Sequence, residues 1–345
     1  MPVSLRGMSS SPLLAAPGAV ASDEPDTGVA AHYGDPFAEQ RALSGSAGLV
    51  DRGNRGVIRV AGPDRLSWLH SLTSQHLERL QPQHAEQALV LDPNGRVQHH
   101  LTLVDDGTAV WAHVEPGTAP ALLEFLESMR FMLRVEPEDV TAEFAVLSLL
   151  GPRGPEIAPT GFVQMREPFG IDILVPRDQL TSVAGEITGG GARLAGIWAY
   201  EALRIAAHRP RLGCDTDHRT IPHEVGWIGT AVHLDKGCYR GQETVARVHN
   251  LGHPPRRLVM LHLDGSEDRL PAHGDSVELN GAAVGTIGSS ARHYELGPIA
   301  LALVKRTTPA DATLLAAGIA AAQEIVVPPD VGGEVKVTLR QRSLR

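Results

Sequence analysis

A cysteine between two cationic side chains is the feature of this sequence best suited to covalent or redox chemistry. Cys238 lies two residues after Lys236 and two residues before Arg240. A thiol reacts as its thiolate, and nearby positive charge favours that form. We therefore predict that Cys238 acts with Lys236 as a nucleophile, a redox thiol or a transient ligand to iron. The alternative is a cysteine that only packs inside a loop, as free cysteines usually do.

The residues around Cys238 are expected to shape its loop. Gly237 and Gly241 allow the backbone to bend tightly or to approach a ligand. Glu243 either pairs with Lys236 or is an ordinary solvated acid. The whole motif consists of Lys236, Gly237, Cys238, Tyr239, Arg240, Gly241, Gln242 and Glu243.

Four further residues are candidates for binding a ligand. The planar guanidinium of Arg204 suits a carboxylate or a ring, although a surface arginine is the alternative. His99 and His100 point to opposite faces of a predicted strand and so cannot easily share one metal. Glu224 either positions a loop near a cavity or is an ordinary polar loop residue. The other histidines show no HExxH pattern and no ligand spacing with carboxylates, so we predict scattered surface histidines and no metal site.

Strands and helices alternate irregularly along the first three quarters of the chain. Without regular strand–helix–strand repeats, the pattern favours an α+β fold over a doubly wound sheet. The predicted strands cover 55–60, 88–91, 97–104, 109–114, 143–150 and 170–175, and the predicted helices cover 66–80, 119–132 and 196–207.

The character of the chain changes at Pro254. Short strand-like runs separated by turns such as Asn280-Gly281 follow it, which indicates a small β-barrel or sandwich. Residues 1–30 are interrupted by Ser, Pro and Gly and are predicted to be a disordered tail. The expected domains are therefore 1–30, 31–253 and 254–345.

Composition limits the classes of partner. The net charge of −9 opposes a polyanion, so direct binding of nucleic acid is not expected. No stretch approaches the ~20 apolar residues of a membrane span. The two cysteines form no disulfide framework, which favours a reducing, cytoplasmic setting.

Two sets of residues resemble a known family. The run from Lys236 to Glu243 resembles the hallmark motif of YgfZ-type proteins, which belong to the superfamily of the glycine-cleavage T-protein. The surrounding chain resembles T-protein scaffolds from about residue 32 to the C-terminus. The resembling segments are His32-Tyr33-Gly34, Glu39, Gly48-Leu49-Val50-Asp51, Val60-Ala61-Gly62-Pro63-Asp64, Ala202-Leu203-Arg204-Ile205, Gly213-Cys214-Asp215 and Ile221 to Trp227.

The resemblance implies a fold, a ligand and a role. The expected fold is a folate-binding α+β region followed by a C-terminal β-barrel, with tetrahydrofolate in a central cavity near Arg204, His99, His100 and Glu224. The implied role is support of iron–sulfur cluster assembly or repair in client proteins, with Cys238 as the reactive centre. The implied partners are folate and iron–sulfur client or assembly proteins.

Departures from the T-protein pattern keep further functions open. The aspartate pair of the T-protein is replaced here by His99-His100, and the nearest acid to its second folate-binding carboxylate, Glu167, is displaced. Aminomethyl transfer is therefore poorly supported, although a folate-dependent one-carbon transferase remains possible. A non-catalytic folate-sensing chaperone module and an accessory factor in tRNA modification also remain compatible with the sequence.

Overall fold

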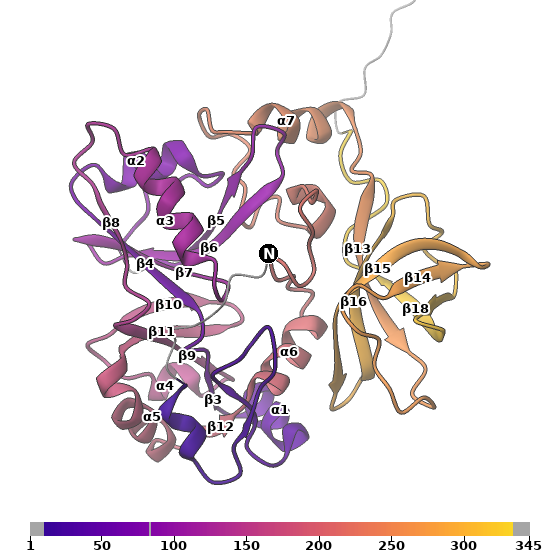
Figure 1. Ribbon diagram of the computed structural model, residues 1–345, viewed down its shortest axis with the longest axis horizontal. Coiled ribbons are helices and arrows are strands. Elements are labelled where there is room, and N and C mark those ends of the chain that lie inside the picture. Colours follow the sequence, from indigo (N-terminus) through magenta and orange to yellow (C-terminus); the bar gives the residue numbers. More distant parts are fainter. Residues whose placement is uncertain (1–9, 83, 334–345) are drawn as a thin grey trace, which may run out of the picture.

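The computed structural model describes residues 10–82 and 84–333. Two five-stranded sheets form one side of the molecule, and a closed barrel forms the other (Figure 1). Helix α7 (Gln242–Leu251) lies at the top of this view and leads towards the first barrel strand. Among the residues described, no helix combines the length and the apolar character needed to cross a membrane.

The first sheet is antiparallel and has the strand order β5–β6–β7–β4–β8. The predicted turn at residues 92–95 closes the β5–β6 hairpin, and Gly95 takes the positive φ that glycine tolerates. Leucines of α2 and α3 pack against the sheet as one core. The elements are β4 (Gly56–Ala61), α2 (Arg65–Leu72), β5 (Glu86–Leu91), β6 (Val97–Asp105), β7 (Ala109–Val114), α3 (Ala119–Ser128) and β8 (Glu136–Asp139).

Helix α2 is shorter than the leucine spacing predicted, because it ends at Leu72 and not at Leu80. The chain leaves the helix at Ser74, whose backbone N–H donates to the Leu89 carbonyl at 2.9 Å. The Ser74 hydroxyl also accepts from the Leu89 amide at 2.9 Å, so this segment is bound to strand β5. Leu80 is still buried, which explains why the helical spacing was misleading.

The second sheet has the strand order β10–β11–β9–β3–β12 and is antiparallel except for the β3–β12 pair. Apolar side chains of α5 pack on one face, and those of α6 and α1 belong to a neighbouring cluster. The elements are α1 (Pro36–Gly45), β3 (Gly48–Asp51), β9 (Phe144–Leu150), α4 (Gly154–Ile157), β10 (Val163–Glu167), β11 (Gly170–Pro176), η2 (Arg177–Gln179), α5 (Leu180–Gly189), β12 (Arg193–Ala195) and α6 (Ile197–Ala206).

The C-terminal strands close into a barrel in the order β13–β16–β15–β14–β17–β18. Aliphatic side chains that alternate along these strands fill the interior. The predicted α+β class with a C-terminal β-barrel is therefore confirmed. The exact division near Pro254 stays a prediction. The strands are β13 (Arg256–Leu263), β14 (Ser276–Leu279), β15 (Ala282–His293), β16 (Gly297–Lys305), β17 (Leu314–Ala316) and β18 (Ile319–Ile325).

The predicted disordered tail over residues 1–30 was wrong for residues 10–30, which are ordered; residues 1–9 lie outside the described residues. This segment forms η1 (Pro12–Ala15), β1 (Val20–Ala21) and the start of β2 (Ala30–His32). Leu13 is buried in the core of the second sheet. Asp26 is also buried and accepts hydrogen bonds from Asn54 and Arg211. These long-range contacts order a segment whose local composition indicates none.

Replacing the apolar anchor of this segment should weaken the fold. We expect Leu13→Ala to lower the free energy of unfolding by about 2–3 kcal/mol, because a buried leucine loses its apolar contacts and leaves a cavity. Urea denaturation followed by circular dichroism measures this change. Val20→Ala is the matched control, since Val20 is 46% exposed in the same segment. Equal, small losses in both variants would show that the segment is not docked through Leu13.

Candidate functional site

A charged cavity of about 50 Å³ lies where the two sheets meet helix α6. Strands β6, β7, β10 and β11 contribute to its wall, together with the segments after β3 and after α6. Five arginines and three carboxylates line it, and further carboxylates behind the lining pair with two of the arginines, Arg204 and Arg211. The lining residues are Arg52, Arg55, His100, Thr102, His113, Glu115, Glu167, Asp172, Tyr200, Arg204, Arg209, Pro210 and Arg211.

Asp172 is the centre of one ionic cluster in this wall. Its carboxylate accepts from Arg52 at 3.2 Å and from His113 Nε2 at 2.8 Å. Burial alone raises the pKa of Asp172, but the Arg52 charge and the His113 hydrogen bond outweigh it and hold the pKa below its usual range. Arg55 Nε donates to His113 Nδ1 at 2.9 Å, so the remaining His113 proton lies on Nε2 and faces Asp172.

Arg211 is the centre of a second cluster that joins distant parts of the chain. It pairs with Asp26 at 2.8 Å, with Glu115 at 2.8 Å and with Glu201 at 3.1 Å. Glu115 also pairs with Arg55 at 3.0 Å. All these side chains are at most 16% exposed, so each charge depends on its partners for the solvation it has lost.

Arg204, a predicted folate ligand, does line the cavity. Its guanidinium is fully engaged, with Glu201 at 2.6 Å and with Asp215 at 2.8 Å, and it donates to the Ser289 hydroxyl at 2.7 Å. Burial opposes its charge, yet Glu201 and Asp215 raise the pKa of Arg204 above its usual value. Its predicted role as a ligand stays a prediction, and the structure shows a further role in joining α6 to the barrel strand β15.

His100 lies in the cavity and is uncharged. Burial lowers its pKa to about 3. Its Nε2 lies 3.0 Å from Gln87 Oε1, and the Gln87 amide nitrogen donates to Glu167 at 2.7 Å. Because an amide oxygen only accepts, Nε2 carries the proton and Nδ1 is an acceptor. Trp227 stacks on the imidazole with a centroid distance of 4.7 Å, which fixes the ring.

His99 and Glu224 are not among the residues that line the cavity. His99 points to the other face of β6, as the strand period predicted, and burial lowers its pKa to about 4. Glu224 lies on η3 (Pro222–Val225) and pairs with Arg256 at 2.8 Å. Its position therefore explains how η3 is joined to the first barrel strand.

The Cys238 loop is separate from the cavity. Cys238 is exposed, whereas Lys236 is buried and its Nζ donates to the carbonyls of His70 and Thr73 at the end of α2. Burial lowers the pKa of Lys236 to about 8. The ammonium group thus binds a helix C-terminus, where positive charge is favourable. Within the described residues it forms no ion pair with Glu243, which is exposed.

Two glycines hold the end of this loop against the β5–β6 hairpin. Gly241 has a φ of +83°, and a Cβ added there would lie 2.5 Å from the Asp92 carbonyl oxygen. A Cβ added at Gly95 would lie 2.8 Å from Thr244. Each backbone therefore approaches the other more closely than a side chain allows. Gln242 completes the turn by accepting from the Tyr239 amide at 3.1 Å.

The sequence analysis missed most of the ionic wall. His113 and Asp172 each interrupt a largely apolar strand with a polar side chain. Such an interruption indicates a buried polar group and could have identified both residues from the sequence. The arginines were harder to recognise, because their partners lie up to 185 residues away in sequence. The missed residues are Arg52, Arg55, His113, Glu115, Asp172, Tyr200, Arg209 and Arg211.

The fold and the site define a two-part architecture, an α+β region with a charged cavity followed by a C-terminal barrel. Residues 23–165 match the GCVT N-terminal domain, and residues 256–343 match the glycine cleavage T-protein C-terminal barrel domain. The two matches together cover most of the chain, which belongs to the glycine-cleavage T-protein superfamily.

Individual relatives support this assignment. An aminomethyltransferase of Symbiobacterium thermophilum is 26% identical over 351 residues, covering 91% of this chain and 88% of the relative. A chloroplast protein of Arabidopsis thaliana with a provisional transferase name is 27% identical over 73% of this chain, which spans 65% of that protein. The crystal structure of aminomethyltransferase T from Bartonella henselae has the same fold, with a TM-score of 0.77 at 19% identity over 94% of this chain and 98% of that one.

Removing the charge of Asp172 should destabilise the protein in a pH-dependent way. Because the folded pKa lies below the unfolded value of about 3.9, its stabilisation is present above about pH 4 and is lost as the pH falls. We expect Asp172→Asn to lower the free energy of unfolding by about 3 kcal/mol at neutral pH, since Arg52 loses a buried partner.

Urea denaturation over a series of pH values tests this expectation. The difference between wild type and Asp172→Asn should shrink as the pH approaches about 3. Asp178→Asn is the control, because Asp178 is an exposed acid just beyond the same strand. A difference that stays constant with pH would contradict an ionised Asp172 in the folded protein.

Proposed function

We propose that this protein binds a tetrahydrofolate in the cavity between its sheets. We further propose that it supports iron–sulfur cluster assembly or repair through the loop that carries Cys238. Its proposed setting is the cytoplasm, and its proposed partners are iron–sulfur client or assembly proteins.

The observation that carries the folate proposal is the charge of the cavity wall. Five guanidinium groups line the cavity, and the 32% exposed Arg209 is the one best placed to reach an anion such as a glutamyl carboxylate of a folate, because buried carboxylates already pair with the other four. The Nδ1 of His100 adds a neutral acceptor for a ring N–H. Family membership supports a ligand of this class, because relatives are named aminomethyltransferase and the glycine-cleavage T-protein pattern that this chain resembles is that of a folate-binding protein.

The residues that line the cavity suit the chemistry of a folate, but the cavity is too small to enclose a whole folate molecule. A volume of about 50 Å³ is below the ~300–1,000 Å³ of pockets that enclose drug-sized ligands. The cavity therefore takes only one end of the ligand unless its mouth opens. Arg209 marks the mouth, because it is 32% exposed and the other lining arginines are at most 8% exposed; it pairs with Glu167 at 2.6 Å.

Aminomethyl transfer is the second candidate, and the names of the relatives favour it. The chemistry of the cavity is the argument against it. His100 stands where the T-protein pattern has a carboxylate, and its pKa of about 3 makes it a poor proton acceptor near neutral pH. Ammonia release from an aminomethylated carrier protein in the presence of tetrahydrofolate is the deciding assay, and we expect none.

The iron–sulfur proposal rests on the motif and on the exposure of Cys238. The chain has two cysteines, too few for the usual four-thiolate ligand set of a stably held cluster. The proposed contribution of Cys238 is therefore a transient thiol or metal contact with a client protein. Its exposed position on a loop held at both ends suits such a contact.

Titration calorimetry under anaerobic, reducing conditions tests the cavity. We expect saturable binding of tetrahydrofolate that weakens about tenfold in Arg209→Ala, because one guanidinium at the mouth is lost. Arg166→Ala is the matched control, since Arg166 is an exposed arginine on the same strand as Glu167. Absence of binding at millimolar folate, or equal affinity in all three proteins, would contradict a folate site here.

The role of the loop is tested in cells that lack the native protein. We expect Cys238→Ser to lose most of its support for the activity of iron–sulfur enzymes while the purified variant still binds tetrahydrofolate, because the loop lies outside the cavity. Ser44→Ala is the control, because it is a similarly small substitution at an exposed position outside the loop and should leave the support of client enzymes unchanged. Full support of client enzymes by Cys238→Ser would remove Cys238 from the mechanism.

A further inference from the structure

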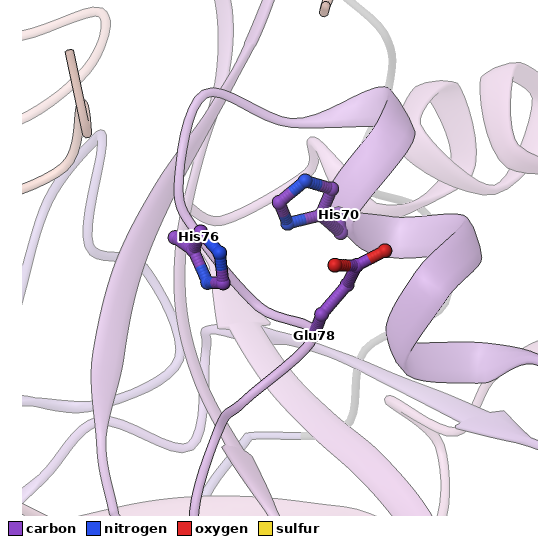
Figure 2. A group of neighbouring side chains, drawn as sticks. All are labelled: His70, His76 and Glu78. Carbon is purple, nitrogen blue, oxygen red and sulfur yellow. The ribbon is translucent and has the colours of Figure 1, made fainter. Parts of the chain in front are cut away.

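Three side chains with metal-binding atoms meet where helix α2 ends, outside the charged cavity. His70 lies in the last turn of the helix, and His76 and Glu78 follow in the segment bound to β5. One ligand atom of each lies within 4.8 Å of the others (Figure 2). The sequence predicted no metal site, because the three residues match no common motif and come together only through the early end of α2.

The two histidine rings of the cluster contact each other. Their centroids are 4.7 Å apart in an edge-to-face arrangement. The Leu77 amide donates to His70 Nδ1 at 3.2 Å, so this side of the ring faces the segment that carries His76 and Glu78.

The other two groups are available for coordination. Within the described part of the chain, no hydrogen bond or ion pair engages the imidazole of His76 or the carboxylate of Glu78. Glu78 is exposed, whereas His76 is half-buried and its ring contacts those of His70 and His233. Ligand atoms bound to one tetrahedral metal lie roughly 3.4 Å apart, given metal–ligand distances of about 2.1 Å. The ligand atoms of the three residues lie at most 4.8 Å apart, so movements of the side chains alone can bring them to the spacing that a bound metal requires.

The composition of the cluster selects a class of metal. Two imidazoles and one carboxylate suit Zn²⁺ or Fe²⁺, whereas Ca²⁺ and Mg²⁺ prefer oxygen ligands alone. We propose that His70, His76 and Glu78 form a binding site for a divalent transition metal of the Zn²⁺ class. Three protein ligands leave at least one coordination position open, as in sites where a metal binds a water or a substrate.

The site borders the cysteine loop but does not depend on the proposed folate function. A Cβ added at Gly237 would lie 4.0 Å from His70 Nε2, so the loop passes the outer edge of this ring. The nearby Lys236 ammonium is held by two backbone carbonyls and so does not occupy the ligand atoms. None of the three proposed ligands lines the charged cavity.

Calorimetric titration of Zn²⁺ into the chelator-treated full-length protein tests the site. We expect saturation at a single equivalent, and an affinity that falls about tenfold or more in His76→Ala and in Glu78→Gln, because each variant loses one ligand. Cobalt gives an independent readout, since Co²⁺ in a site with few ligands shows visible absorption that both variants should lose. Neither side chain is in the core, so both variants should keep the fold.

Matched controls separate this site from general metal binding by a chain with 16 histidines. His84→Ala and Glu124→Gln change exposed residues of the same types nearby and should bind Zn²⁺ like the wild type. Cys238→Ser should do so as well. Wild-type affinity in His76→Ala or Glu78→Gln, or the absence of saturable binding, would overturn the proposal. Unchanged tetrahydrofolate binding in the same two variants would show that this result concerns the metal site alone.

Discussion

The paired charges around Arg211 are the interaction on which the architecture depends. Arg211 follows helix α6 and bonds to Asp26 of the N-terminal segment and to Glu115 at the end of β7. Through Glu115 and Arg55 the same network reaches β4 and the Asp172 cluster. Buried charges of this kind are tolerated only when all partners are present. The network therefore ties the N-terminal segment, both sheets and α6 to one another in the folded protein.

This dependence explains why the cavity is polar throughout. All five of its arginines pair with a carboxylate, so the charges of the wall compensate one another. Arg209 and His100 differ, because one is partly exposed and the other has an uncharged acceptor atom. Those two groups, joined through Gln87 and Glu167, are the adaptable part of an otherwise fixed wall.

Local patterns in the sequence predicted the elements better than their assembly. The hairpin at residues 92–95, the pleat that separates His99 from His100 and the C-terminal barrel all follow from short-range rules. The ion pairs of Arg211 and the docking of Leu13 do not, because they join residues that no local period relates. The predicted end of helix α2 was wrong for the same reason, because the hydrogen bonds between Ser74 and Leu89 end the helix although the leucine spacing continues.

The contact between Gly95 and Gly241 has a mechanical consequence. The hairpin that carries Gly95 at its tip also carries His100 along its second strand, and Gly241 ends the loop of Cys238. The two backbones are in direct contact, so no side chain lies between them that could change its conformation when one of them moves. A shift of the hairpin tip towards Gly241 therefore requires the start of α7 to move as well, which links the strand that carries His100 to the cysteine loop.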